Sequence, residues 1–338
     1  MAPRPPSRLP LTGRTPTSRA RGARTLLAAL VIAAVAVPVS GAARPTAVPA
    51  PAPAALAPLR AATPEALARR YAANRGSILA AERMATGHGD RRRAAALRAF
   101  ADPARHFLSF DGRDGGRGAE VFGDLSTARR IAVLVPGAGI SVDAYGRLRA
   151  GAVALRRQLG DGSAVIGWLG YETPAMVGRA AVTTGRAEEA APGLRAFLGE
   201  LHRARPAART SLLCHSYGSV VCAEAAPGLD VADIVLYGSP GTGVGDVSAL
   251  HTPATVWAGR GGDDWIAGVP HVQLRLPFCT IGFGTDPVSP EFGARRFEAG
   301  DGGHSDYLKP GSVSLRSLAR IVSGGTGTGT GSGGGRHA

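Results

Sequence analysis

Residues 212–221 read LLCHSYGSVV: an apolar run, a short polar turn and a second apolar run. The stretch Ser211–Cys214 is typical of the end of a buried strand, and the valines and alanines after Gly218 favour a helix. A strand-to-helix turn this tight strains the residue at its apex and projects its side chain out of the sheet. Only small residues fit two places before and after that apex, where Cys214 and Gly218 stand. The pattern therefore predicts a Ser216 hydroxyl exposed at the carboxyl edge of a sheet. A buried helix-capping serine is the alternative.

From residue 107 onward, short apolar runs alternate with helical patterns and glycine-rich turns. Apolar runs without polar alternation predict strands that are buried on both faces, and helices between them predict a parallel sheet that is covered on both sides. The first two strands follow each other closely, which favours an antiparallel start. The predicted class is α/β, with a mostly parallel central sheet and helices on both faces, preceded by a short N-terminal helical segment. The predicted strands are 107–110, 119–122, 131–135, 164–168, 211–214, 234–237, 255–258 and 272–274, and the predicted helices are 145–159, 188–203, the stretch after Ser216, and 312–322.

The first residues of the chain have the pattern of an export signal. Six arginines and no acid precede the apolar run Leu26–Val39, and the small residues Ser40-Gly41-Ala42 follow it. The run is shorter than the about 20 apolar residues of a membrane span, and Pro38 interrupts it. We therefore expect a signal peptide over residues 1–42 that is cleaved after Ala42 or its neighbour, and a secreted or envelope-associated protein. An uncleaved N-terminal anchor is the alternative.

Composition divides the rest of the chain. Residues 43–62 are rich in alanine and proline, which predicts a semi-extended linker with no packed element. Residues 63–106 are predicted to be helical and begin at Thr63-Pro64-Glu65, which combines a capping hydroxyl, a proline at the first helical position and an acid in the first turn. Residues 107–322 form the main domain. Residues 323–338 are a Gly/Thr/Ser-rich tail, a composition typical of disorder.

Charge and cysteine content narrow the classes of partner. The formal net charge is +14, and every basic residue except Lys309 is an arginine. These arginines are not interleaved with aromatic residues, which make up 5% of the chain, so we predict no nucleic-acid partner. An association with the anionic cell envelope is a hypothesis. Cys214 is expected to be a small buried strand residue, and a bond between Cys222 and Cys279 is left open.

A serine at such a turn needs a base to remove its proton. In this architecture the acid and then the histidine follow the nucleophile along the chain. His304 lies in the stretch DGGHSDY (301–307), just before the last predicted helix, and we predict that it is the base. His271 enters a predicted strand and is interpreted as structural. His215 adjoins Ser216, so its side chain should point away from the serine and line a pocket at most.

The acid should follow the predicted strand 255–258. The stretch RGGDDWI (260–266) offers two adjacent aspartates, and side chains of adjacent residues on a turn face different ways. We predict Asp264, with the apolar Trp265 and Ile266 behind it as a shield from water. Asp263 is the second candidate and Asp286 the third. The acid would orient the imidazole and stabilise its cation without taking its proton.

An acyl-transfer site also needs backbone donors for the developing oxyanion. The amide of Tyr217, which follows the expected nucleophile, is one candidate. The strand 131–135 ends in Pro-Gly-Ala-Gly, whose glycines let the backbone approach a carbonyl closely, so we assign the second donor to Ala138 or Gly139. A simple strand-ending turn is the alternative for this loop.

A second glycine-rich loop follows the predicted strand 234–237. The loop GSPGTGVG (238–245) lacks the Lys-Ser/Thr end of a phosphate loop and the dinucleotide spacing, and is interpreted as a pocket wall. No His/Cys/Asp cluster has metal-ligand spacing, so we predict no metal and no cofactor.

The motifs together carry a resemblance to a known family. They are VLVPGAG, CHSYGS, YGSPG, GGDDWI, DPVSPEFGARRF and GGHSDY, in this order over about residues 107–322. They resemble an actinobacterial α/β-hydrolase family of unknown function. The resemblance implies the α/β-hydrolase fold and a triad at Ser216, Asp264 and His304. In similar sequences glycine is frequent at the first position of the turn, where this chain has Cys214.

We therefore expect an exported serine hydrolase that cleaves an ester or related acyl bond through an acyl-enzyme, with a small-molecule or lipid-like acyl substrate. A non-catalytic, envelope-associated binding protein on the same fold is one alternative, and a serine peptidase is another.

Overall fold

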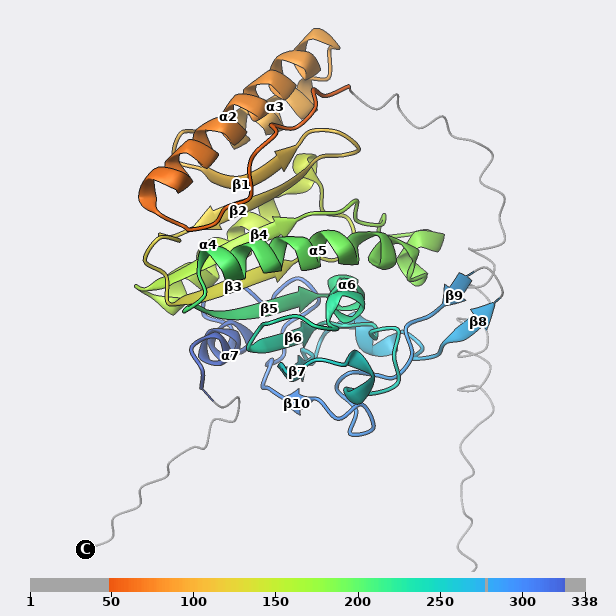
Figure 1. Cartoon of the computed structure of the whole chain (residues 1–338). Coiled ribbons are helices and arrows are strands. Elements are labelled where there is room, and N and C mark those ends of the chain that lie inside the picture. The colour runs from red at the N-terminus through yellow and green to blue at the C-terminus, as the bar shows by residue number, and fades with distance from the viewer. Residues whose placement is uncertain (1–48, 277–278, 326–338) are drawn as a thin grey trace, which may run out of the picture. The chain divides into compact units, whose positions relative to one another are not determined.

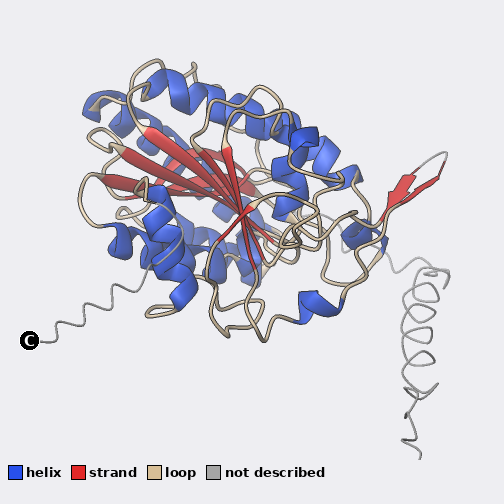
Figure 2. Cartoon of the chain, turned by 90° about the horizontal axis from the view of Figure 1, so that it is seen from below, coloured by secondary structure: helices blue, strands red, loops and turns tan. Residues whose placement is uncertain are grey.

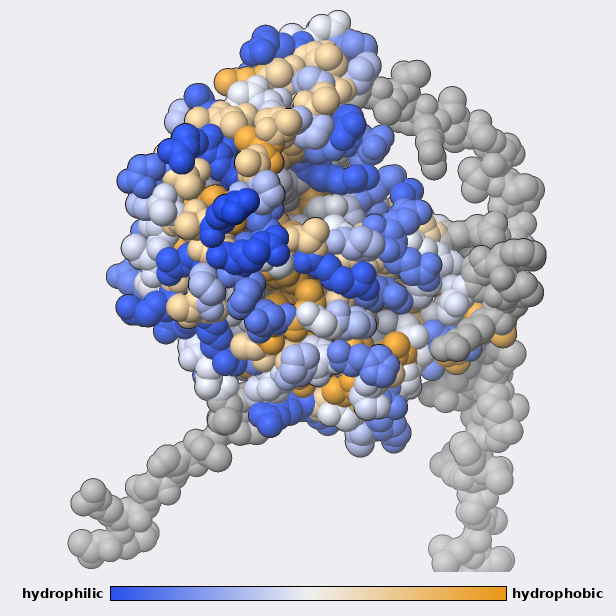
Figure 3. Space-filling model, viewed as in Figure 1, coloured by the Kyte–Doolittle hydropathy of each residue, from blue (hydrophilic) through white to orange (hydrophobic). Residues whose placement is uncertain are grey.

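The computed structural model describes residues 49–276 and 279–325. The expected leader (1–42), the start of the linker and residues 326–338 of the expected tail lie outside these ranges, so the predictions for them remain predictions. Among the described helices, none combines the length and the apolar character that a membrane crossing needs. On the face shown in Figure 3, hydrophilic residues dominate, and apolar residues lie in small groups.

The centre of the domain is an eight-stranded sheet in the order β1-β2-β4-β3-β5-β6-β7-β10 (Figure 1). The pairs β1–β2 and β2–β4 are antiparallel, and all other neighbours in the sheet are parallel. This arrangement confirms the predicted α/β class and the antiparallel start. The strands are β1 (His106–Asp111), β2 (Arg117–Phe122), β3 (Arg130–Val135), β4 (Ser163–Leu169), β5 (Arg209–His215), β6 (Asp233–Tyr237), β7 (Thr255–Gly259) and β10 (Arg295–Arg296).

Helices cover both faces of the sheet (Figure 2). The alternation along β3 shows why: Ile131 and Val133 join a core cluster with α5 and α6, whereas Ala132 and Leu134 join a cluster with α4 and α7. A strand that is apolar at every position can thus pack against helices on both faces of the sheet. The helices are α2 (Pro64–Gly87), α3 (Arg91–Phe100), α4 (Gly146–Leu159), α5 (Gly185–Ala204), α6 (Gly218–Ala225) and α7 (Val313–Val322), with short 3-10 turns at Val142–Ala144, Arg179–Val182, Ser248–Leu250 and Trp265–Gly268.

The helical segment before the sheet begins where the sequence predicts. The Thr63 hydroxyl accepts a hydrogen bond from the Ala66 amide at 3.2 Å, and Pro64 occupies the first helical position. Helix α2 packs against β1, at the sheet edge that β2, β4 and β3 separate from β5. The bidentate ion pair between Arg105 and the buried Glu120 joins the end of this segment to β2.

The linker differs from the expectation. Its described part has no helix or strand, but Leu59 and Ala62 are buried in the core. The Leu59 amide donates to Glu200 at 2.6 Å, and the Ala62 amide donates to the Ala204 carbonyl at 3.1 Å. The prediction of an unpacked tether is therefore wrong at Leu59 and Ala62, because α5 offers this extended stretch an apolar face, the Glu200 carboxylate and the Ala204 carbonyl.

One strand prediction in the C-terminal part also differs, and two short strands there were not predicted. The strand predicted at 272–274 lies at Leu274–Leu276 (β8) and pairs with Cys279–Ile281 (β9) in a separate antiparallel hairpin. Strand β10 does not follow from the sequence pattern, because it consists of two exposed arginines and carries no apolar signal.

Candidate active site

Ser216 lies at the apex of the turn between β5 and α6. Its φ is +53°, in the left-handed region that a non-glycine residue adopts at a strain. A Cβ atom at Gly218 would lie 2.5 Å from the Val135 carbonyl oxygen and 2.7 Å from that of Pro136, so only glycine fits there. The side chain is less open than expected, because Ser216 is only 9% exposed. The turn therefore holds the hydroxyl in one direction, toward the loop that carries His304.

A disulfide joins the two sides of this turn. Cys214, at the end of β5, is bonded to Cys222 in α6, and both residues are fully buried. The expectation of a simple buried Cys214 is thus incomplete. Cys222, for which the sequence left a bond to Cys279 open, is bonded to Cys214 instead. The spacing of the two cysteines across the turn was the available signal: two places before the serine and six after it.

The structure brings Ser216, His304 and Asp264 into one hydrogen-bonded chain. His304 Nε2 lies 2.9 Å from Ser216 Oγ, and His304 Nδ1 lies 2.9 and 3.1 Å from the two carboxylate oxygens of Asp264. Asp264 follows β7 and is 2% exposed. Burial would raise the pKa of this carboxyl, but hydrogen bonds from His304, Tyr307 and the Ile266 amide outweigh it and hold the pKa below its usual value. Asp264 is therefore an anion that keeps Nδ1 protonated and leaves Nε2 free to accept the serine proton.

The other predicted acids lie elsewhere. Asp263 is exposed, although it precedes Asp264 directly. Asp286 binds Arg260 at 2.7 Å and lies 3.4 Å from His271 Nε2. Neither carboxylate forms a hydrogen bond to His304 within the described chain. Trp265 is half exposed, with its ring 4.6 Å from that of His304, so Ile266, but not Trp265, is buried behind the acid as expected.

Tyr307 is a residue of the site that the sequence analysis missed. Its hydroxyl donates to Asp264 Oδ2 at 2.5 Å and accepts from the Gly261 amide at 3.0 Å. Gly238, in the glycine-rich loop after β6, makes room beside this pair, because a Cβ there would lie 3.0 Å from Asp264 Oδ2. The available signal was the position of Tyr307 in the same motif as His304. Tyr307 therefore holds the carboxylate by a second side chain besides the imidazole of His304.

His215 supports the loop that carries His304. Its Nε2 lies 2.8 Å from the His304 carbonyl oxygen, which can only accept, so this nitrogen carries the proton. The two imidazole rings lie 4.7 Å apart. Burial, together with the nearby His304 and Arg147, lowers the pKa of His215 to about 3. His215 therefore stays neutral and acts as a donor to the backbone.

This neutral histidine has a consequence for stability. In the unfolded chain a histidine takes up a proton below about pH 6.5, whereas folded His215 does not. Its contribution to the free energy of unfolding should thus fall by about 1.4 kcal/mol per pH unit as the pH drops below about 6.5. We expect urea unfolding of His215→Gln between pH 7 and pH 4.5 to lack this slope. The exposed His251→Gln variant should retain it. Parallel stability curves for wild type and His215→Gln would contradict the assignment.

The three backbone amides predicted to bind the oxyanion differ in whether they already donate a hydrogen bond within the protein. The Gly139 amide already donates to the Pro174 carbonyl at 2.9 Å, so its assignment as an oxyanion donor is wrong. The Ala138 and Tyr217 amides have no backbone or side-chain acceptor in the described part of the chain. A Cβ at Gly137 would lie 2.7 Å from Ser216 Cβ, so the loop passes directly over the serine. Ala138 and Tyr217 remain the two candidate donors.

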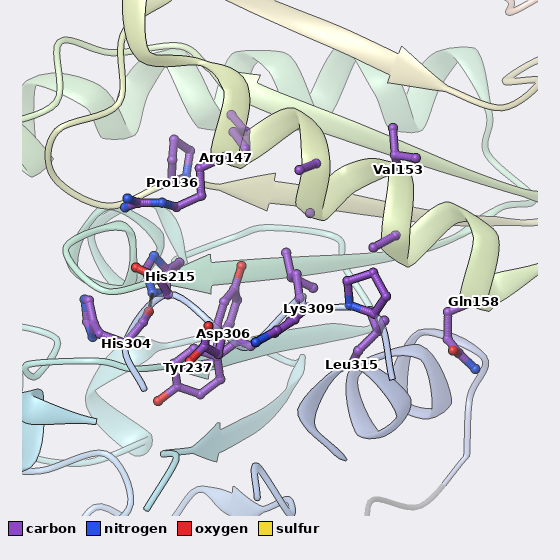
Figure 4. Close-up of a pocket in the computed structure, with 18 of the residues that line it drawn as sticks. Pro136, Arg147, Val153, Gln158, His215, Tyr237, His304, Asp306, Lys309 and Leu315 are labelled. Atoms are coloured by element: carbon purple, nitrogen blue, oxygen red, sulfur yellow. Dashed lines mark hydrogen bonds between the residues drawn. The ribbon is translucent and has the colours of Figure 1, made fainter. Parts of the chain in front are cut away.

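An open cleft of about 720 Å³ begins at His304 and His215 and runs between α4 and α7 (Figure 4). Most of its lining is apolar, from Ile140 and Leu148 at one side to Leu308 and Leu315 at the other. Within residues 49–276 and 279–325, no group of three or more His, Cys, Asp or Glu residues is arranged to hold a metal ion.

Comparisons with known proteins agree with this architecture. A family model described as alpha/beta hydrolase matches residues 111–274. An uncharacterised protein of Mycobacterium tuberculosis is 30% identical over 264 residues, which are 64% of this chain and 38% of that protein. An uncharacterised protein of Mycobacterium bovis is 34% identical over 143 residues, 38% of this chain and 53% of the relative. The chain thus spans well under two thirds of the length of these relatives.

The solved structures that match this chain are distant in sequence. A crystal structure of an α/β serine hydrolase without a lid, from Xanthomonas campestris, is 19% identical with a TM-score of 0.43, and the match covers 65% of this chain and 94% of that one. The esterase LipW from Mycobacterium marinum is 15% identical with a TM-score of 0.40, over 73% of this chain and 88% of that one.

Proposed function

We propose that the chain, whose residues 111–274 match the alpha/beta hydrolase family model, is a serine hydrolase that cleaves an ester or related acyl bond through an acyl-enzyme. The observation that carries the proposal is the continuous hydrogen-bonded chain from Ser216 Oγ through His304 to Asp264. A hydroxyl is a poor nucleophile unless an adjacent base removes its proton, and this chain supplies such a base.

The reaction has two halves. Ser216 Oγ attacks the carbonyl carbon while His304 Nε2 takes the hydroxyl proton, and the carbonyl oxygen becomes an oxyanion. His304 then gives that proton to the leaving oxygen as the ester bond breaks, which yields the alcohol and an acyl-Ser216. A water molecule, deprotonated by the same nitrogen, releases the acid and restores the serine.

Charge stabilisation comes from groups that are already in place. The amides of Tyr217 and Ala138 are the donors for the oxyanion, and such donors act strongly when they need no rearrangement. Asp264 stabilises the imidazolium that forms at His304. Because Tyr307 and the Ile266 amide also bind this carboxylate, it can orient the ring without turning toward another partner.

The proposal includes export of the protein. The pattern of residues 1–42 supports a secretory leader, and the disulfide between Cys214 and Cys222 supports an oxidising compartment, where such bonds persist. The substrate would be a small-molecule or lipid-like acyl ester, met outside the cell or at its envelope.

A fluorophosphonate probe tests the proposal, since it labels only a serine that a base activates. We expect the wild-type protein to be labelled, Ser216→Ala to remain unlabelled, and the exposed control Ser323→Ala to be labelled like wild type. An unlabelled wild type would favour the non-catalytic binding protein. Faster cleavage of amides than of matched esters would favour the peptidase.

A further inference from the structure

The cleft beside the triad carries a charge pattern that the reaction does not use. Three cationic side chains line it: Arg147 and Arg157 from α4, and Lys309 from the loop before α7. All three residues are exposed, and none forms an ion pair with an acid of the described residues. The lining contains one carboxylate, Asp306, which accepts a hydrogen bond from the Gly303 amide at 3.1 Å. The cleft therefore combines an apolar wall with an excess of positive charge.

Several other arginines of the fold are held in ion pairs. Arg70, Arg93 and Arg105 each bind an acid at 2.6–2.8 Å and fasten one element to another. Unpaired cations that line a concave apolar site attract anions and orient them. Arg147 acts closest to the reaction, because its charge contributes to the lowered pKa of His215, and Figure 4 shows its side chain reaching over the end of the cleft that holds His215 and His304.

The position of the cleft indicates which part of a substrate it holds. His304 belongs to its lining, whereas Ser216 does not. In the proposed reaction His304 protonates the oxygen of the leaving alcohol, so the group on that oxygen departs on the imidazole side. The acyl part stays bonded to Ser216, outside the lining of this cleft.

We propose that the cleft binds the alcohol part of the ester and that this part carries an anionic group, a phosphate or a carboxylate, which Arg147 and Lys309 hold. The inference rests on the proposed serine hydrolase activity and names its substrate class. The apolar wall formed by Leu148, Leu308 and Leu315 receives the carbon skeleton between the ester and the anion.

The first test compares two esters of butyric acid that differ only by a phosphate group on the alcohol. We expect kcat/KM, measured by acid release in a pH-stat, to be about tenfold higher for 1-butyrylglycerol 3-phosphate than for 1-butyrylglycerol, since two exposed charge contacts of typical strength add up to that ratio. The ratio should fall as salt is added, because exposed charges are screened. Equal values for the two esters, or no hydrolysis of either, would overturn the inference.

The second test removes the cations. In the double variant Arg147→Gln/Lys309→Gln the preference for the phosphate-bearing ester should fall to about twofold or less, and in the double variant Arg91→Gln/Arg92→Gln it should stay at the wild-type ratio. Arg91 and Arg92 are exposed arginines of α3 outside the cleft, and their replacement matches the change in net charge. A preference that survives in the double variant would overturn the assignment of these residues.

A third comparison separates the two ends of the substrate and the two proposals. p-Nitrophenyl butyrate and p-nitrophenyl hemisuccinate differ in a carboxylate on the acyl side, and we expect similar kcat/KM for both. A strong preference for the hemisuccinate would place the anion on the acyl side and overturn the inference while leaving the hydrolase intact. Absence of fluorophosphonate labelling at Ser216, by contrast, would overturn the hydrolase itself.

Discussion

Replacing Ser216 by alanine is expected to lower the turnover of an activated ester by about 10⁶, because the three side chains of a triad act as one unit. Without the hydroxyl, His304 can activate only water, and no acyl-enzyme forms. The measurement is the steady-state hydrolysis of p-nitrophenyl esters of graded chain length, with the purified variant at high concentration.

The variant should keep its fold, so the loss can be assigned to chemistry. Alanine takes the same backbone position with a smaller side chain, and the disulfide between Cys214 and Cys222 holds the strand and helix on either side of the turn. Thermal unfolding close to that of wild type is the control. Residual turnover within tenfold of wild type, in a folded variant, would show that another group supplies the nucleophile.

The second large effect is expected at the acid. Changing Asp264 to asparagine should lower kcat by about 10⁴, because an amide in this position no longer enforces the tautomer that protonates Nδ1 or stabilises the imidazolium. The neutral side chain also offers an NH₂ group to His304 Nδ1, which favours the proton on Nε2, where it blocks the reaction. The measurement is kcat for the same esters near neutral pH.

Asp263 supplies a matched control for this variant. It is the preceding residue and has the same chemistry, but its side chain is exposed and forms no hydrogen bond to His304 in the described part of the chain. We expect kcat of Asp263→Asn to stay within about twofold of wild type, since exposed charges contribute little. Equal losses in the two variants, or a larger loss at Asp263, would contradict the geometry at this turn.

Several parts of the molecule follow from local patterns in the sequence. The fully apolar runs at 131–135 and 234–237 can be satisfied only by a sheet that is covered on both faces, so they determine the α/β class. The small residues around Ser216 determine a sharp turn between strand and helix, because larger side chains would collide with the neighbouring backbone. These are local properties, since each depends on spacing within a few residues.

Other parts were decided only when distant segments met. Asp263, Asp264 and Asp286 are chemically equal in the sequence, and the backbone of the turn after β7 sends one of the adjacent pair inward and the other to solvent. Tyr307 became part of the site because its loop folds back over Asp264, whereas the Gly139 amide already donates a hydrogen bond to the Pro174 carbonyl. The packing of Leu59 against α5 could not be predicted either, because the surrounding stretch is rich in alanine and proline and has no helix or strand pattern.

The difference between the features that follow from local sequence and those that depend on distant segments has a simple physical reason. Backbone conformation and the alternation of apolar side chains are set by neighbours along the chain, and a sequence displays those neighbours directly. Hydrogen-bond partners and side-chain direction at the ends of strands depend on loops that come from far away, as with His304 and Ser216, which are 88 positions apart. The sequence by itself determined the layers and the turn that presents a serine. The tertiary structure decided which acid and which backbone amides lie beside that serine and its histidine.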